Sequence, residues 1–95
     1  MKVITARIGE KQFEDLKNIE KEEQTERAEV MRKLLANAIK EWKVRKALEL
    51  LKEHKVTLRR AAKLADASYA EMLDLASNAD IDMGYSLKEL RKDLA

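Results

Sequence analysis

Apolar and polar positions alternate over the first eight residues, a pattern typical of a β-strand. One side of the alternation carries Ile4, Ala6 and Ile8, and the other carries Val3, Thr5 and Arg7. This period of two, rich in β-branched residues and closed by Gly9, predicts a strand over Lys2–Ile8. A lone strand leaves both edges unpaired, and no other segment of the chain shows the pattern. We therefore expect it to pair antiparallel with the same strand of a second copy about a two-fold axis.

The apolar spacing then becomes helical. Phe13, Leu16 and Ile19 predict a helix over Glu10–Glu22. After a polar break over Glu23–Glu26, Thr25 is the expected N-cap of a second helix. The second helix carries a wide apolar stripe formed by Val30, Met31, Leu34, Leu35, Ala38, Ile39 and Trp42. We expect this helix to continue to Leu51, with a bend or a rotation of its apolar side near residues 43–46, where polar residues interrupt the stripe.

Polar caps predict shorter helices in the rest of the chain. Thr57 precedes Leu58–Ala65, and Ser68 with Glu71 forms a capping-box pattern ahead of a fourth helix. Ser86 with Glu89 predicts a last helix, whose apolar positions are Leu87, Leu90 and Leu94. The chain is thus predicted to be mainly α, with an N-terminal strand that forms an intermolecular two-stranded antiparallel ribbon. We expect a dimerisation domain over residues 1–45 and a helical region over residues 46–95.

Composition narrows the function classes. A chain of 95 residues buries only about 60% of its unfolded surface, so we expect oligomerisation to supplement its core. The absence of Cys and the single His exclude disulfides and thiolate or histidine-built metal sites, and we expect no metal or cofactor. Asp80 and Asp82 have no nucleophile or base nearby, so we do not expect an enzyme. No apolar run approaches the roughly 18 residues of a membrane span, which favours a cytoplasmic protein without a membrane partner.

Charge is distributed unevenly along the chain. Residues 43–63 hold eight basic and two acidic residues, a net charge of +6, whereas residues 66–95 hold three basic and seven acidic residues, a net charge of −4. A basic middle and an acidic end are compatible with two partners of different kinds.

The strand and the two helices after it suggest a DNA-binding arrangement. A two-stranded ribbon fits the major groove, where outward-facing Val3, Thr5 and Arg7 would contact base edges. The start of the second helix would hold a phosphate through Thr25, Arg27 and Ala28. The dimer core would then consist of Ile4, Ala6, Ile8, Val30 and Leu34. The alternative is a ribbon that only dimerises the chain.

The segment KVITARIGEKQFEDLKNIEKEEQTERAEVMRKLL resembles the ribbon-helix-helix family of DNA-binding dimers. The resemblance implies base contacts by Val3, Thr5 and Arg7 and a phosphate clamp at the start of the second helix. The family usually has a glycine between the two helices, whereas this chain has Glu22–Gln24 there. Ala28 stands in place of the serine that the family usually has in the clamp.

The segment ALELLKEHKVTLRRAAKLADASYAEMLDLASNADI, residues 47–81, resembles a small family of VapB-like antitoxins that are paired with PIN-domain ribonuclease toxins. At two positions where that family usually has glycine, this chain has His54 and Asp66. The resemblance implies that this half binds the toxin. We expect the apolar stripe Leu87, Leu90 and Leu94, together with Arg91, to dock on that toxin.

These features favour an antitoxin of a type II toxin–antitoxin pair, a homodimer that binds its own operator DNA and neutralises a PIN-domain toxin. One alternative is a protein-only inhibitor, and another is an orphan transcriptional regulator without a toxin. Residues 57–79 also match the lengths of a helix-turn-helix, with Ser68, Tyr69 and Glu71 as groove residues. Its second helix is acidic, however, and phosphates repel such a surface.

Overall fold

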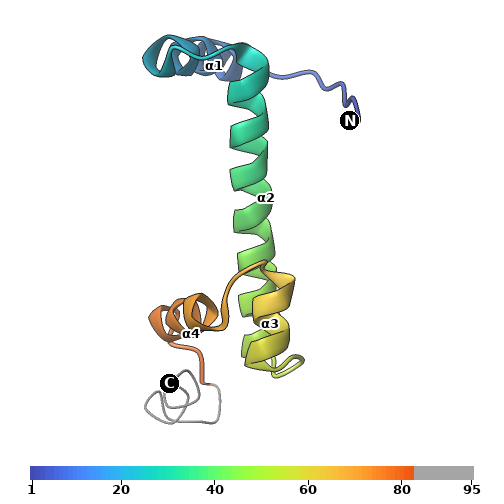
Figure 1. The fold of residues 1–95 in the computed structure, drawn as a ribbon, viewed down its shortest axis with the longest axis vertical. Coiled ribbons are helices and arrows are strands. Elements are labelled where there is room, and N and C mark those ends of the chain that lie inside the picture. The colour runs from blue at the N-terminus through green and yellow to red at the C-terminus, as the bar shows by residue number, and fades with distance from the viewer. Residues whose placement is uncertain (83–95) are drawn as a thin grey trace. The chain divides into compact units, whose positions relative to one another are not determined.

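In a computed structural model of the chain, residues 1–82 are described. They contain the helices α1 (Glu10–Glu23), α2 (Arg27–Lys52), α3 (Leu58–Leu64) and α4 (Tyr69–Asn78) (Figure 1). The predicted mainly α class is therefore confirmed. Within the described residues, no helix is both long enough and apolar enough to cross a bilayer.

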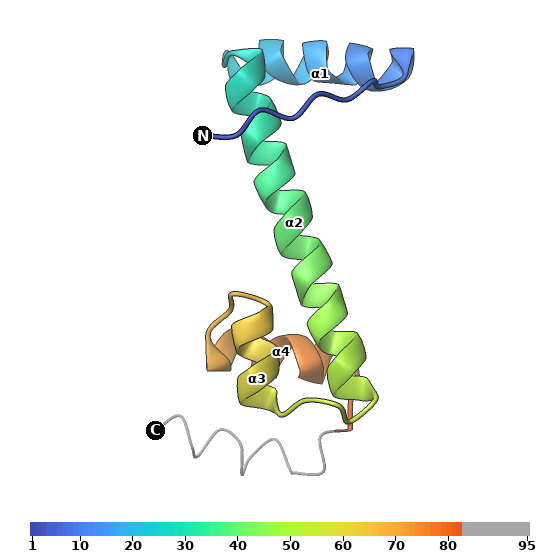
Figure 2. The same cartoon turned by 90° about the vertical axis from the view of Figure 1, so that its right-hand side faces the viewer.

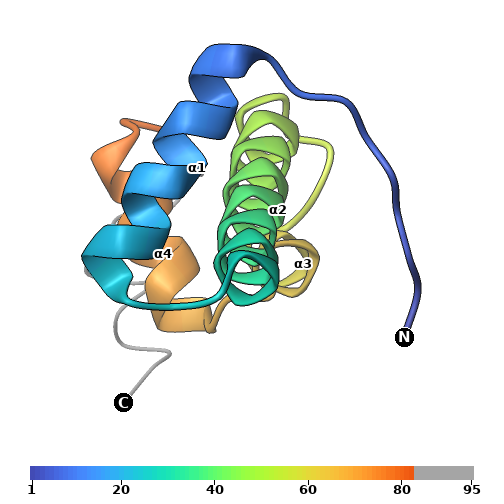
Figure 3. The ribbon, with the colours of Figure 1, turned by 90° about the horizontal axis from the view of Figure 1, so that it is seen from above.

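The strand predicted over Lys2–Ile8 is not seen. Residues 1–9 lead into α1 as an extended segment that is neither helix nor strand (Figure 3). A strand is defined by backbone hydrogen bonds to a neighbouring strand, and residues 1–82 of one copy contain no second strand to supply them. The intermolecular ribbon remains a prediction.

The chain divides into two compact units, Met1–Asn37 and the residues from Ala38 onwards. The boundary lies inside α2, which runs unbroken for 26 residues. The predicted continuation of this helix to Leu51 is confirmed. The domain boundary expected at residues 45 and 46 also falls within α2.

The second unit has a closed apolar core. Figure 2 shows α3 and α4 beside the C-terminal half of α2. The core consists of Ala47, Leu51, Leu58, Ala61, Ala62, Ala65, Met72, Leu73 and Ala76. Its alanines leave little space between the helices, and the partly buried Leu64, Leu75 and Ile81 pack against it.

Side-chain caps fix where α3 and α4 begin. The Thr57 hydroxyl accepts a hydrogen bond of 3.2 Å from the Arg60 N–H. The Ser68 hydroxyl accepts one of 3.1 Å from the Glu71 N–H, and the Glu71 carboxylate accepts one of 3.4 Å from the Ser68 N–H. Both predicted caps are confirmed. Ser and Thr favour these positions because their hydroxyl groups accept from N–H groups that would otherwise lack partners.

Each described helix is followed, within two positions, by a non-glycine residue in the left-handed region. These residues are Gln24 (φ 51°), His54 (φ 58°), Asp66 (φ 52°) and Asp80 (φ 54°). After each, the next residue donates its N–H to a carbonyl five positions back, as Lys55 does to Leu50 at 2.9 Å and Ala67 does to Ala62 at 2.9 Å. This is the Schellman arrangement, which glycine adopts without the steric cost that a Cβ brings.

Candidate nucleic-acid and dimer interface

Both sides of the N-terminal segment are exposed. Val3, Thr5 and Arg7, the predicted base contacts, are exposed, and so is Ala6. Ile4 is 82% exposed and Ile8 is 49% exposed, although both are predicted to lie in a dimer core. Within residues 1–82, the apolar side of this segment is therefore uncovered.

Arg27, one of the predicted clamp residues, has local partners within the first unit. The Arg27 Nε atom lies 2.6 Å from the Glu20 Oε1 atom, and the Arg27 guanidinium lies 4.8 Å from the centre of the Phe13 ring. Lys17 Nζ lies over the same ring at 4.8 Å. Arg27 is thus held between a carboxylate and an aromatic ring, which joins the start of α2 to α1. Ala28 is exposed in the first turn of α2.

The prediction that Thr25 caps α2 is wrong. The helix begins at Arg27, so the cap position is Glu26, whose carbonyl accepts from the Val30 N–H at 3.0 Å. The Thr25 hydroxyl instead donates to the Glu23 carbonyl at 2.9 Å. Thr25 satisfies the end of α1 rather than the start of α2, because the left-handed Gln24 brings its side chain back towards the last turn.

The remaining predicted dimer-core residues, Val30 and Leu34, differ from each other. Val30 is 1% exposed, so one copy already buries it, whereas Leu34 is 43% exposed. Leu34 belongs to a row of exposed apolar side chains on α2, which we name the α2 stripe: Met31, Leu34, Leu35, Ile39 and Trp42. Their spacing of three or four residues places them along one side of the helix.

The second unit's core uses a different side of the same helix. Trp42 and Ala47 are five residues apart, which places them about 140° apart around the helix axis. Ala47 is fully buried, whereas Trp42 is 57% exposed. The predicted change near residues 43–46 is therefore a rotation of the apolar side within an unbroken helix. The α2 stripe stays uncovered in the described chain.

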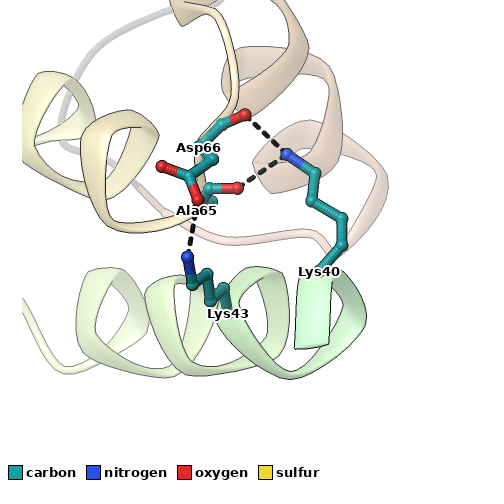
Figure 4. Close-up of polar contacts among 4 residues, drawn as sticks. All are labelled: Lys40, Lys43, Ala65 and Asp66. Carbon is teal, nitrogen blue, oxygen red and sulfur yellow. Dashed lines mark hydrogen bonds and ion pairs between the residues drawn. The ribbon is translucent and has the colours of Figure 1, made fainter. Parts of the chain in front are cut away.

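Two lysines of α2 hold the turn between α3 and α4 (Figure 4). Lys40 Nζ donates to the carbonyl oxygens of Ala65 and Asp66 at 2.6 and 2.7 Å. Lys43 Nζ lies 2.6 Å from the Asp66 Oδ2 atom. The hydrogen bond and the charge of Lys43 lower the pKa of Asp66 below its ordinary value. Lys40 satisfies the carbonyl oxygens at the end of α3, and both lysines bring positive charge to the end of the helix where the dipole favours it.

The helix-turn-helix interpretation loses its proposed groove residues. The Ser68 and Glu71 side chains each accept a hydrogen bond from the backbone N–H of the other residue. Arg59 lies over the Tyr69 ring at 4.9 Å. The three residues therefore have structural roles at the start of α4. Sequence spacing gave no sign of Lys40 and Lys43 as the residues that hold this turn, because they lie 25 and 23 positions before their partners.

The described residues contain no cluster of three or more His, Cys, Asp or Glu side chains that could hold a metal ion. The predicted toxin-docking residues Leu87, Leu90, Arg91 and Leu94 lie outside the described residues. Comparisons with protein-family models, with curated proteins and with solved structures found no match.

Proposed function

We propose that the chain is a dimeric ribbon-helix-helix antitoxin of the cytoplasm. Two copies pair their Lys2–Ile8 segments into a ribbon that enters the major groove of operator DNA, and the C-terminal half neutralises a PIN-domain ribonuclease. The observation that carries this proposal is the exposure of large apolar side chains in one copy: Ile4 and Ile8 in the N-terminal segment, and the residues of the α2 stripe.

A second copy of the chain is the occupant that fits this surface. The uncovered residues come from the N-terminal segment and from one side of α2, the two parts that a ribbon-helix-helix dimer pairs across its two-fold axis. A two-fold contact is self-complementary, so the same apolar residues cover each other in the two copies. Burial of a Leu or Ile side chain contributes about 1.5–3 kcal/mol, so several such residues per copy outweigh the cost of association.

Backbone geometry supports the two family resemblances. Gln24, His54 and Asp66 have φ values of 51°, 58° and 52°. His54 and Asp66 fall where the resembled antitoxin family usually has glycine, and Gln24 lies in Glu22–Gln24, the segment where the ribbon-helix-helix family usually has one; glycine adopts positive φ most readily. The chain thus keeps the backbone turns that those glycines would make, although its residues differ there.

In the proposed complex, Thr5 and Arg7 contact base edges and α2 binds phosphate. Both side chains are exposed in one copy and are free to enter a groove. Arg27 is paired with Glu20 at 2.6 Å, so phosphate binding by its guanidinium requires that this pair open. The free backbone N–H groups in the first turn of α2 bind phosphate without that rearrangement.

Substitution of Arg7 tests the DNA-binding role. We expect Arg7→Ala to weaken binding to the DNA upstream of the chain's own gene by about 1–3 kcal/mol, because a bidentate contact to guanine is lost. Arg7→Lys keeps the charge but loses the fork, so it should recover only part of that affinity. Both variants should still dimerise in sedimentation velocity and still inhibit the nuclease encoded beside the gene. Unchanged DNA affinity in Arg7→Ala would contradict the proposed base contact.

One observation favours a second candidate, the protein-only inhibitor whose ribbon only dimerises. The Glu20–Arg27 pair occupies the guanidinium that a phosphate clamp would use. This candidate predicts that the parent protein forms dimers and inhibits the nuclease without binding the upstream DNA. Glu20→Gln distinguishes the two: it should strengthen DNA binding if Arg27 contacts phosphate, and have no such effect if the ribbon only dimerises.

A further inference from the structure

Helix α3 has one apolar and one basic side. Leu58, Ala61, Ala62 and Ala65 are buried in the second unit's core. Between them in sequence lie Arg59, Arg60 and Lys63, all of them exposed. At about 100° per residue, these cations fall on the side of the helix that faces away from the core. We name this surface the α3 basic face.

The α3 basic face is largely free of local neutralisation. Arg59 lies over the Tyr69 ring at 4.9 Å, which orders its guanidinium and leaves the charge in place. No carboxylate within residues 1–82 forms an ion pair with any of the three cations, whereas Lys43 and Lys55 in the same unit are each paired with one. The three charges are therefore available to an anionic partner.

The composition of this face separates two classes of partner. A protein–protein interface has an apolar or aromatic centre and is depleted in Lys. The outward side of α3 has only cations, and its apolar residues are in the core. Phosphates are the partners that bind such a surface through charge alone, and duplex DNA presents one of them for about every 1.7 Å of its axis.

We propose that the α3 basic face binds the phosphate backbone of duplex DNA without reading its sequence. Residues 59 and 63 are four positions apart, so the three cations lie within about 6 Å along the helix axis and can contact neighbouring phosphates. Helix α4 carries Glu71 and Asp74 among its exposed residues, so DNA would approach the unit on its α3 side. This inference does not depend on the proposed ribbon, because all its residues belong to the second unit.

The salt dependence of binding by the full chain tests the proposal. The probe is a short duplex of random sequence, and filter binding is measured between about 50 and about 200 mM salt. Affinity falls as salt rises, and each phosphate contact contributes about 0.9 to the magnitude of the slope of log affinity against log salt. Arg59→Gln/Arg60→Gln/Lys63→Gln should therefore reduce that magnitude by about 2.7. Arg60→Gln/Lys63→Gln, which keeps the Arg59–Tyr69 contact, should reduce it by about 1.8.

A matched control separates this site from net charge. Lys11→Gln/Lys21→Gln removes the same charge as the double variant from exposed positions of α1 and should leave the slope unchanged. The proposal is overturned if this control lowers the slope as much as the α3 variants do, if the double variant has no effect, or if the parent chain does not bind the duplex. Tighter binding to single-stranded RNA than to the duplex would also overturn it. Arg7→Ala tests the ribbon through affinity for the upstream DNA, so its outcome is separate from that of the α3 variants.

Discussion

The two units of this chain differ in how fully they bury their apolar residues. The second unit has nine buried residues in one cluster. Side chains cap the starts of α3 and α4, and Lys40 and Lys43 hold the turn between these helices. In residues 1–37, Val30 is the only buried residue, while Phe13, Leu16 and Ile19 are half-buried. The second unit thus closes an apolar core of its own, although Ile39 and Trp42 stay exposed, whereas the first unit buries only Val30 and leaves most of its large apolar side chains exposed or half-buried.

Two leucine truncations should separate the units most clearly. Leu73 is fully buried in the second unit, so Leu73→Ala should lower the free energy of unfolding by about 2–5 kcal/mol in denaturant melts followed by circular dichroism. Leu34, on the exposed α2 stripe, is the matched control: Leu34→Ala should weaken dimerisation in sedimentation experiments and shift the concentration-dependent range of Tm to higher protein concentrations. Equal losses that do not depend on concentration would mean that the first unit also closes by itself.

Glycine substitution at the helix ends should stabilise each unit by a smaller amount. Gln24→Gly and His54→Gly remove a Cβ from a left-handed residue, and each should raise the free energy of unfolding by about 0.5–1 kcal/mol. His54→Ala keeps the Cβ and should bring no gain. The gain from His54→Gly should be the same at every protein concentration, because the second unit closes its own core. The gain from Gln24→Gly should vary with protein concentration, because the first unit is proposed to pair with a second copy. A loss of stability in both glycine variants would contradict the assigned backbone conformations.

The smallest expected effect concerns the Lys43–Asp66 ion pair. Because the pKa of Asp66 is lowered in the folded chain, its stabilising contribution is present above the unfolded-state pKa and is lost as pH falls through the folded-state value. Asp66→Asn removes the charge but keeps a side chain that tolerates positive φ. The Tm of the parent should exceed that of the variant near pH 7, and the difference should shrink below about pH 4. A constant difference down to strongly acidic pH would mean that the pair does not stabilise the fold.

Local chemistry explains why most of the helices could be predicted. The apolar spacing of α1, the Thr57 cap and the Ser68–Glu71 capping box act over three or four residues, and each element begins where these signals place it. The cap of α2 was misplaced, because the Thr25 hydroxyl had a closer partner in the Glu23 carbonyl. A cap prediction considers the helix that follows a polar residue, not the helix that ends before it.

Contacts between distant residues are what sequence spacing could not supply. The Glu20–Arg27 pair crosses a turn, and Lys40 reaches a carbonyl 25 positions further along the chain. No periodic pattern encodes such distances, because they depend on how the helices pack. The ribbon depends on a second molecule and the docking residues lie beyond residue 82, so the structure of one copy tests neither of these predictions.

The position of Trp42 gives the chain a built-in optical reporter. It is the only tryptophan in the sequence, and it stands 57% exposed at one end of the α2 stripe. An indole in water emits at longer wavelength than one in an apolar contact. If the α2 stripe is the contact of the proposed dimer, dilution of the unlabelled protein should shift its intrinsic emission to the red, and the midpoint of that shift gives the dissociation constant directly.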